Sequence, residues 1–278
     1  MPRRWLLSLL LALLPSVARA QARPVVHQRV VGQLGPTGVE HAVALGYRAD
    51  LGDPRELLFT GAHAEVGVVN YTSPIYSISG AYLEVSPVAF LSLRAAFTGA
   101  EVWPLGTDGA GYFASQDRSL PSLAGADASH ASGWNVHLTG LLQGAVPIGP
   151  LRAILWNEVT FEHVRLGEAP YHFSARHDAV LAQNDWVISS WAMALVEIPL
   201  DVGLVLRAGV YDEVRHVPSS GALFNQVGVM AMLASEQPVP EVGQLLPFVR
   251  AGIYTNHERR AGDPTLLLGA MIRYELTP

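Results

Sequence analysis

The sequence predicts an all-β fold, a transmembrane antiparallel up-and-down β-barrel with 12 strands. Three observations predict it. Residues 1–20 have the pattern of an export signal, later segments alternate between apolar and polar residues, and no later apolar run is long enough for a membrane helix. An exported chain without such a helix crosses lipid only as a closed barrel, because every backbone polar group must be paired there.

The first element is a predicted secretory signal peptide, residues 1–20, which leaves 21–278 as the barrel domain. Arg3 and Arg4 give a positive start, 5–14 is apolar, and the small residues of 18–20 suit cleavage before Gln21. The apolar stretch has only about half of the ~20 residues that a membrane helix needs. We therefore expect cleavage rather than anchoring.

The composition restricts the possible functions. The chain is 50% hydrophobic and only 15% charged, whereas ordinary soluble domains have about 25% charged residues. After the signal, 15 arginines and no lysine face 24 acidic residues, a net charge of −9. This balance argues against nucleic-acid binding. The absence of cysteine excludes disulfides, which a chain of this length does not need because it can close a large barrel.

Clusters of Gly, Pro, Asp, Asn and Ser separate the predicted strands. The strands are, in order, residues 24–33, 38–49, 57–69, 77–86, 88–103, 134–147, 151–165, 185–198, 202–215, 223–235, 244–256 and 265–276. The connections are 35–36, 50–54, 70–74, 86–87, 104–133, 147–150, 166–184, 199–202, 217–221, 236–241 and 257–264. Each strand is long enough for a tilted crossing of the membrane, which takes about 9–11 residues.

The connections alternate in length. Those at 86–87, 147–150 and 199–202 are tight, whereas 104–133 and 166–184 are long and polar. We expect the long loops to face outward and the tight turns to face the periplasm. Because the number of strands is even, both ends of the barrel domain should then lie on the periplasmic side.

Period-two alternation predicts which face of each strand contacts lipid. In 265–276, apolar residues at 266, 268, 270 and 272 share one face, while Arg273 and Glu275 lie on the other. The strands 88–103 and 202–215 show the same separation. The register is least defined in 24–33, 185–198 and 223–235, where Ser190 and Asn225 interrupt apolar stripes. We expect the apolar face toward lipid and the charged face toward the lumen.

The mature chain resembles the Gram-negative outer-membrane β-barrel proteins over nearly all of its length. Its last strand is similar to their C-terminal assembly signal through Gly269, Ile272, Tyr274 and Leu276. Leu276 stands where Phe is usual, and Thr277-Pro278 extends beyond it. The resemblance implies an outer-membrane location, contact with outer-membrane lipid, and recognition by the barrel-assembly machinery during biogenesis.

The predicted lumen carries charges of both signs. The inward charged positions are Glu40, Arg48, Glu65, Glu84, Arg94, Arg152, Glu158, Glu162, Arg207, Glu213, Arg250, Arg273 and Glu275. Acidic and basic residues nearly balance, so no strong ion preference is expected. We expect Glu/Arg ladders between neighbouring strands, which either brace a structural barrel or line a passive, porin-like pore. The bore would depend on these ladders and on how far 104–133 folds inward.

Three alternatives remain open. Twelve-stranded outer-membrane phospholipases resemble this architecture and use a His-x-Ser pair; His130/Ser132 and His172/Ser174 are such pairs, although both fall in predicted loops and lack the following Asn-Gly. The histidines and acids of 162–178 could bind a transition metal, but their spacing fits no compact zinc pattern, so neither metal nor cofactor is predicted. A soluble periplasmic barrel would hold a small apolar ligand inside and place its charges outside.

Overall fold

The computed structural model of the chain describes residues 22–53, 55–103, 111–113, 127–128, 130–200, 203–235 and 244–275. The predicted signal peptide, most of 104–133, and Leu276 of the assembly signal lie outside the described residues. No helix in the described residues is long and apolar enough to span a membrane.

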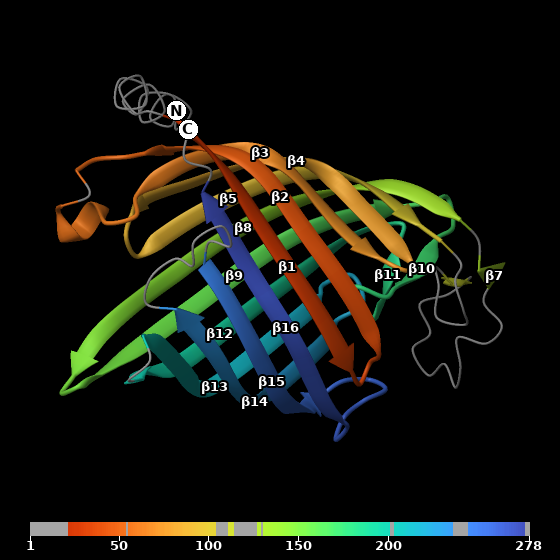
Figure 1. Cartoon of the computed structure of the whole chain (residues 1–278). Helices are drawn as coiled ribbons and strands as arrows, with labels where there is room; N and C mark the ends of the chain where they lie inside the picture. The colour runs from red at the N-terminus through yellow and green to blue at the C-terminus, as the bar shows by residue number, and fades with distance from the viewer. Residues whose placement is uncertain are drawn as a thin grey trace, which may run out of the picture.

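Within the described part of the chain, 12 antiparallel strands close into one barrel (Figure 1). They are β1 (Arg23–Leu34), β2 (Gly38–Asp50), β3 (His63–Ser73), β4 (Tyr76–Val88), β5 (Leu91–Val102), β8 (Ala131–Ile148), β9 (Leu151–Leu166), β12 (Asn184–Leu200), β13 (Leu204–Val217), β14 (Ala222–Ser235), β15 (Gln244–Asn256) and β16 (Pro264–Glu275). Neighbours along the chain pair in the sheet, and β1 pairs with β16 to close it. The predicted fold class is confirmed.

A second, four-stranded sheet is formed by the two long loops. Its strands are β6 (Gly111–Phe113), β7 (Asp127–Ala128), β10 (Tyr171–Ser174) and β11 (Ala179–Ala182), in the order β11-β10-β6-β7. It lies at one end of the barrel, where Figure 1 shows β10 and β11. The sequence predicted loops here, because segments this short carry no detectable alternation.

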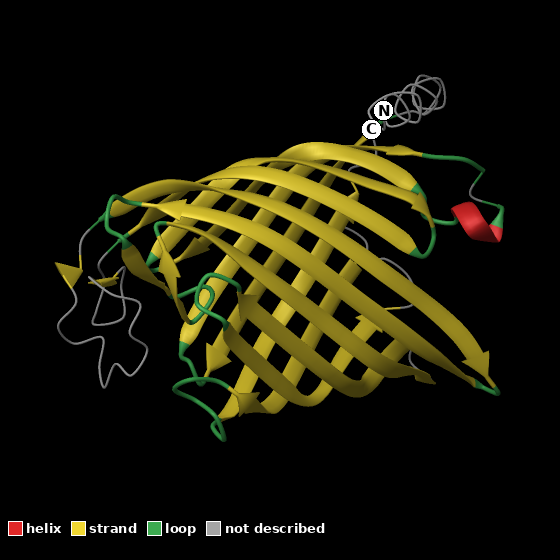
Figure 2. Ribbon diagram, turned by 180° about the vertical axis from the view of Figure 1, so that it is seen from behind, coloured by secondary structure: helices red, strands yellow, loops and turns green. Residues whose placement is uncertain are grey.

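Several strand boundaries were predicted wrongly. The strand predicted at 57–69 begins only at His63, because Leu57–Phe59 forms a short 3-10 helix, η1 (red in Figure 2). The same strand continues to Ser73, so the following turn is only two residues long. Likewise, β4 extends to Val88 and β5 starts at Leu91, because their pairing is irregular between Val85 and Val88. The paired length of a strand depends on its neighbours, which local pattern does not report.

The connections separate by length between the two ends of the barrel. The tight connections β4–β5, β8–β9 and β12–β13 lie at the end where β1 starts and β16 finishes, and Val25 pairs there with Glu275. The long connection 167–183 lies at the opposite end, where β5 ends and β8 begins (Figure 1). This is the arrangement that the loop lengths predicted, with the long loops on one side.

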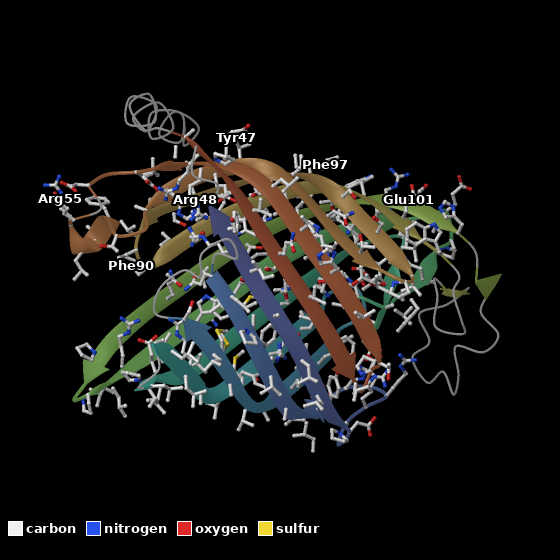
Figure 3. The ribbon with its side chains drawn as sticks, in the orientation of Figure 1. Tyr47, Arg48, Arg55, Phe90, Phe97 and Glu101 are labelled. Atoms are coloured by element: carbon white, nitrogen blue, oxygen red, sulfur yellow. The ribbon has the colours of Figure 1, made fainter. Side chains whose placement is uncertain are left out.

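The outer wall is apolar and the inner wall is polar. Tyr47 (63% exposed) and Phe97 (60%) project outward, whereas Arg48 (5%) projects into the barrel (Figure 3). Large exposed apolar side chains such as Leu45, Val68 and Val229 continue this outer surface around the wall. A soluble barrel with a small apolar ligand would need the reverse arrangement, so the structure argues against that alternative.

Polar exceptions on the outer wall are hydrogen-bonded to each other. Asn157 donates to Ser190 Oγ (3.3 Å), and Asn225 donates to Asp212 Oδ1 (2.6 Å). Ser190 and Asn225 therefore do face outward, as the interrupted apolar stripes indicated. Pairing across neighbouring strands reduces the cost of placing these groups on an apolar surface.

Because outward residues contact lipid and inward residues face the lumen, an arginine should destabilise the barrel much more at an outward position than at an inward one. Val229→Arg places a charge on the apolar outer wall of β14, and we expect it to lower the free energy of unfolding in lipid by about 2–4 kcal/mol. Thr160→Arg is the matched control, because Thr160 lines the lumen between Glu158 and Glu162. Urea unfolding in lipid vesicles measures both. Equal losses for the two variants would contradict the assigned faces.

Candidate functional site: the lumen and its hairpin

The β10–β11 hairpin enters the barrel mouth and packs against its inner wall. Leu181 and Ala179 contact a buried apolar cluster that also contains Val164, Val187, Val217, Ala222 and Phe224, from β9, β12, β13 and β14. Leu181 and His172 are fully buried. The chain therefore uses part of its second long loop, 167–183, to fill the mouth.

The base of the hairpin is fixed by Asp185 at the start of β12. This buried carboxylate accepts hydrogen bonds from the backbone N–H of Ala182 (2.9 Å) and of Trp186 (2.8 Å), and from Ser219 Oγ (2.6 Å). Three donors satisfy the carboxylate away from water. Asp185 thus ties the hairpin to β12 and to the β13–β14 turn.

The tip carries three consecutive charged or titratable residues that contact different parts of the wall. Arg176 lies 3.5 Å from Glu162 on β9 and 3.8 Å from Glu40 on β2. His177 Nε2 lies 3.1 Å from Glu162, and Arg215 on β13 donates to the His177 carbonyl oxygen (2.5 Å). The tip is thereby fixed from three directions by groups that are largely buried.

Asp178 holds the tip to the β15–β16 loop. Its carboxylate lies 2.6 Å from Arg260, 3.0 Å from Arg259 and 3.0 Å from His257. Burial alone would raise the pKa of Asp178, but hydrogen bonds from His257 and Arg260 outweigh it and lower the pKa to about 2. The stabilisation from this depressed pKa is present above the ordinary value and is lost only as the pH falls toward 2.

The predicted lumen residues lie at inward positions and pair mostly across strands. Glu65 contacts Arg48 (2.6 Å), Glu84 lies 3.8 Å from Arg94, and Glu213 contacts Arg250 (2.6 Å). Arg152 and Arg207 both contact Glu197 (2.8 Å each), an acid outside the predicted set. Arg273 and Glu158 also line the lumen, and the Glu275 side chain lies outside the described residues. Of the proposed assembly signal, Gly269, Ile272 and Tyr274 lie in β16.

Several charged residues of the site were missed by sequence reasoning. Arg29 on β1 contacts Glu40 (2.7 Å), and Arg215 contacts Glu213 (3.0 Å). Arg215 lies in a predicted strand at the same parity as Arg207 and Glu213, so the alternation itself contained the signal. Arg29 lies in the predicted strand 24–33, where no lumen residue was assigned. Arg176 and His177 lie in a loop without periodic alternation and enter the lumen through the hairpin fold.

Below the hairpin tip the lumen contains a chamber of about 570 Å³. Its charged and titratable lining consists of Arg29, Arg94, Arg176, Arg215, Arg273, His27, His137, His177, Glu158 and Glu162. Hydroxyl groups of Thr139, Thr160 and Ser189 also line it. The chamber is bounded by strands from all round the barrel and by the hairpin above.

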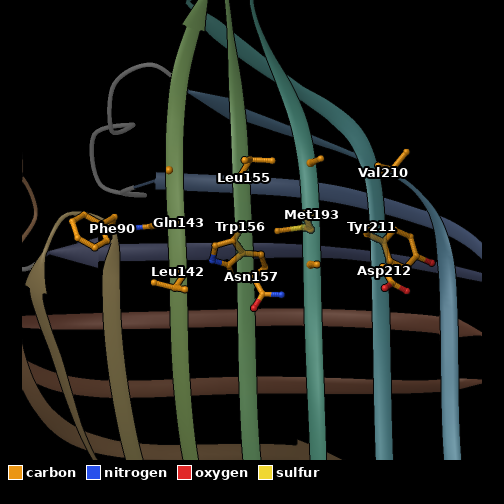
Figure 4. A pocket seen from close by; sticks show the side chains of 13 residues that line it. Phe90, Leu142, Gln143, Leu155, Trp156, Asn157, Met193, Val210, Tyr211 and Asp212 are labelled. Atoms are coloured by element: carbon orange, nitrogen blue, oxygen red, sulfur yellow. The ribbon is translucent and has the colours of Figure 1, made fainter.

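Part of the inner wall is apolar instead. Met193, Leu195, Tyr211, Met230 and Met232 form a buried cluster. Trp156 and Trp191 pack against it, and their rings contact each other edge to face with centroids 4.5 Å apart. Three of these residues, Trp156, Met193 and Tyr211, also border a shallow hollow of about 650 Å³ on β8, β9, β12 and β13 (Figure 4). This hollow is lined mainly by apolar groups and offers no charged cluster.

Ser174, His177 and Glu162 form a hydrogen-bonded series. Ser174 Oγ lies 2.7 Å from His177 Nδ1, and His177 Nε2 lies 3.1 Å from Glu162 Oε2. The Ser174–His177 contact spans a β-turn whose backbone bond runs from His177 N to Ser174 O (3.1 Å). Of the two predicted His-x-Ser pairs, His130 contacts Glu101 (2.7 Å), and His172 makes no hydrogen bond with any described residue.

The buried His172 ring predicts that acid weakens the hairpin. Burial lowers the pKa of His172 to about 4, with a smaller contribution from His177. The free energy that holds the hairpin in the mouth is therefore unchanged above the ordinary pKa of histidine. It decreases by up to about 3 kcal/mol as the pH falls from 6.5 to 4. Hydrogen exchange of 171–182, corrected for intrinsic rates, should accelerate over this range, and the change should shrink in His172→Phe. Identical protection at both pH values would contradict this assignment.

The residues considered for a metal site do not converge. Within the described ranges, no group of three or more His, Cys, Asp or Glu side chains is arranged to hold a metal ion. His163 faces outward between Trp134 (ring centroids 5.1 Å apart) and Trp186 (4.9 Å). Asp178 is instead paired with Arg259 and Arg260.

No family model matches the chain, and no curated protein is similar to it in sequence. Three solved structures are similar in fold. LpxR from Salmonella typhimurium has a TM-score of 0.50 and 12% identity, covering 91% of this chain and 100% of that one. The β domain of the Bordetella autotransporter Brka has 0.47 and 14% (92% and 99% covered), and the translocator domain of NalP from Neisseria meningitidis has 0.46 and 11% (99% and 96%).

At these identities the similarity concerns the fold alone. Together with the closed barrel and its apolar outer wall, the similarity to LpxR gives the chain the fold of an outer-membrane β-barrel. The resemblance inferred from the sequence is confirmed at that level. Lipid is therefore the environment of the outer wall.

Proposed function

We propose that this outer-membrane β-barrel is a passive pore for small hydrophilic solutes, narrowed at its mouth by the β10–β11 hairpin. The observation that best supports this proposal is the chamber of about 570 Å³ beneath the hairpin tip, which is lined by charged and hydroxyl side chains. Such a polar space holds water, whereas a purely structural barrel fills its interior with side chains.

The constriction in this proposal is formed by the second long loop. The expectation that 104–133 sets the bore concerns a segment most of which lies outside the described residues. The described segment 167–183 occupies the mouth, where Arg176 and His177 contact Glu162 on β9 and Asp178 contacts Arg260 in the β15–β16 loop.

Conductance in planar bilayers tests the pore. Purified, heat-modifiable barrel is expected to give small channels, since a water-filled chamber continues below the narrowed mouth. A variant without the hairpin should give larger ones. Absence of channels from both proteins, each shown to be folded by its gel shift, would overturn the proposal.

A second candidate function is ester hydrolysis by Ser174, favoured by the Ser174–His177–Glu162 series. In this reading Ser174 Oγ attacks the ester carbonyl carbon, and its proton passes to His177 Nδ1. His177 then gives that proton to the departing alcohol oxygen as the ester C–O bond breaks, and water hydrolyses the acyl-serine to release the acid and restore Ser174. Glu162 accepts the Nε2–H and stabilises the protonated ring. Ser174 also borders a cavity of about 40 Å³, part of whose wall is formed by the apolar side chains of Ile75, Ile78 and Val102.

A fluorophosphonate probe tests this candidate directly. Labelling of the folded barrel at Ser174, lost in Ser174→Ala and retained in Ser132→Ala, is the expected result if the series is catalytic. Ser132 belongs to the other His-x-Ser pair and lies exposed on β8. Failure of the probe to label Ser174 would leave the series as a structural bond of the turn.

A further inference from the structure

We infer that the chamber is a binding site for small anions that carry carboxylate or phosphate groups. This inference names a solute class for the proposed pore, and it rests on that function only for the route by which the anion arrives. The binding itself rests on the lining of the chamber, its size and the hydrogen-bonding state of Arg94.

The chamber lining is cationic although the chain is acidic. Five arginines line the chamber against only two acids, Glu158 and Glu162. With histidine neutral, this is a surplus of three positive charges in a mature chain of net charge −9. The surplus therefore results from the three-dimensional arrangement of the charges and not from composition.

Apart from Glu162, which pairs with Arg176, the acids that pair with the chamber arginines are not part of the lining. Glu40 contacts Arg29 (2.7 Å) and Glu213 contacts Arg215 (3.0 Å), and neither acid borders the chamber. A guanidinium has five N–H donors, so one carboxylate at its back orients it and leaves donors for a ligand. Within the cavity, arginine donors therefore outnumber carboxylate acceptors.

Arg94 shows this unused capacity most clearly. Its Nη1 lies 3.8 Å from Glu84, and its guanidinium lies 4.0 Å above the ring of Tyr82. Its Nη2 is buried and has no hydrogen-bond partner in the described part of the chain. A buried unpaired donor calls for a water or an ion, and an anion satisfies both its hydrogen bond and its charge.

The size and the remaining lining suit a small organic anion. About 570 Å³ lies within the usual range of small-ligand pockets, roughly 300–1,000 Å³. Hydroxyls of Thr139, Thr160 and Ser189 offer donors and acceptors for the neutral part of such a solute. Glu158 opposes the anion: it makes no hydrogen bond or ion pair within the described residues and interacts electrostatically with Arg29 and Arg94.

Isosteric changes of opposite sign test the inference. Under a KCl gradient, the reversal potential should show roughly threefold preference for chloride, since the field of the lining selects the counter-ion. Arg94→Gln should reduce this preference and Glu158→Gln should increase it. Arg152→Gln is the matched control, because Arg152 does not line the chamber and pairs with Glu197.

Calorimetric titration with inorganic phosphate gives a readout that needs no conduction. Arg94→Gln should weaken phosphate binding roughly tenfold, the value of a charged hydrogen bond, while Arg152→Gln should not. Conducting barrels without anion preference or phosphate binding would overturn the inference and keep the pore. Non-conducting barrels that bind phosphate through Arg94 would overturn the pore and keep the site.

Discussion

Removing the hairpin is expected to raise the single-channel conductance several-fold. The change replaces 170–182 with a short Gly-Ser linker between β9 and β12. In the intact barrel, β10, β11 and their tip fill the mouth, and Arg176 and His177 form part of the roof of the chamber. Without these residues, the pore should no longer narrow at its mouth and should be as wide there as in the chamber.

The control removes an exposed loop at the other end of the barrel. Replacing 55–60, which includes η1, by a similar linker changes a segment between β2 and β3 that lies far from the hairpin along the barrel (Figure 1). Its conductance should match that of the intact chain. A folded, heat-modifiable barrel without the hairpin whose conductance is unchanged would show that the hairpin does not obstruct ion flow.

The barrel could be predicted from the sequence because its physics is local. A residue on a strand with one lipid face and one polar face must alternate with its neighbours, so segments such as 265–276 reveal both strand and face. The loop lengths then indicate which end of the barrel faces outward and which faces the periplasm. The ends of the strands were less predictable, since β3 begins at His63 only where β2 and β4 provide partners.

The candidate site could be predicted only in part, because it depends on contacts between distant segments. Parity placed Glu162 in the lumen, but no pattern indicated that Arg176 and His177 would meet it there. The cationic lining depends on which acids turn away from the chamber, as Glu40 and Glu213 do. Counting charges by parity gave near neutrality and missed this separation.

The predicted His-x-Ser pair illustrates the same limit. Residues 172 and 174 lie on the same side of a strand, yet no hydrogen bond joins their side chains. Ser174 ends β10, and the turn brings His177 back to it. Ser174 and His177, three residues apart across a tight turn, form a hydrogen bond. His172 and Ser174, two residues apart on the strand, do not. Turn geometry therefore determined the partner.

Glu162→Gln is expected to release the hairpin tip from the lumen. Glu162 is buried. Its carboxylate lies 3.5 Å from the Arg176 guanidinium, 3.1 Å from the His177 ring and 3.3 Å from the His137 ring, and it accepts a hydrogen bond from the Asn135 side-chain amide (3.2 Å). Neutralising it leaves the Arg176 guanidinium buried with only Glu40, at 3.8 Å. Breaking a buried ion pair from one side costs about 3–5 kcal/mol, which the tip avoids by moving into water.

A single cysteine at the tip measures this release, because the native chain contains no cysteine. In an Ala175→Cys background, Glu162→Gln should raise the rate of thiol labelling roughly 100-fold, the equivalent of about 3 kcal/mol in docking. Glu84→Gln is the control, since Glu84 is a partly buried lumen acid that contacts His63 and Arg94 of the wall and not the hairpin. Because the apolar face around Leu181 remains intact in both variants, equal labelling rates would mean that this face, and not the ion pairs of the tip, holds the hairpin in the mouth.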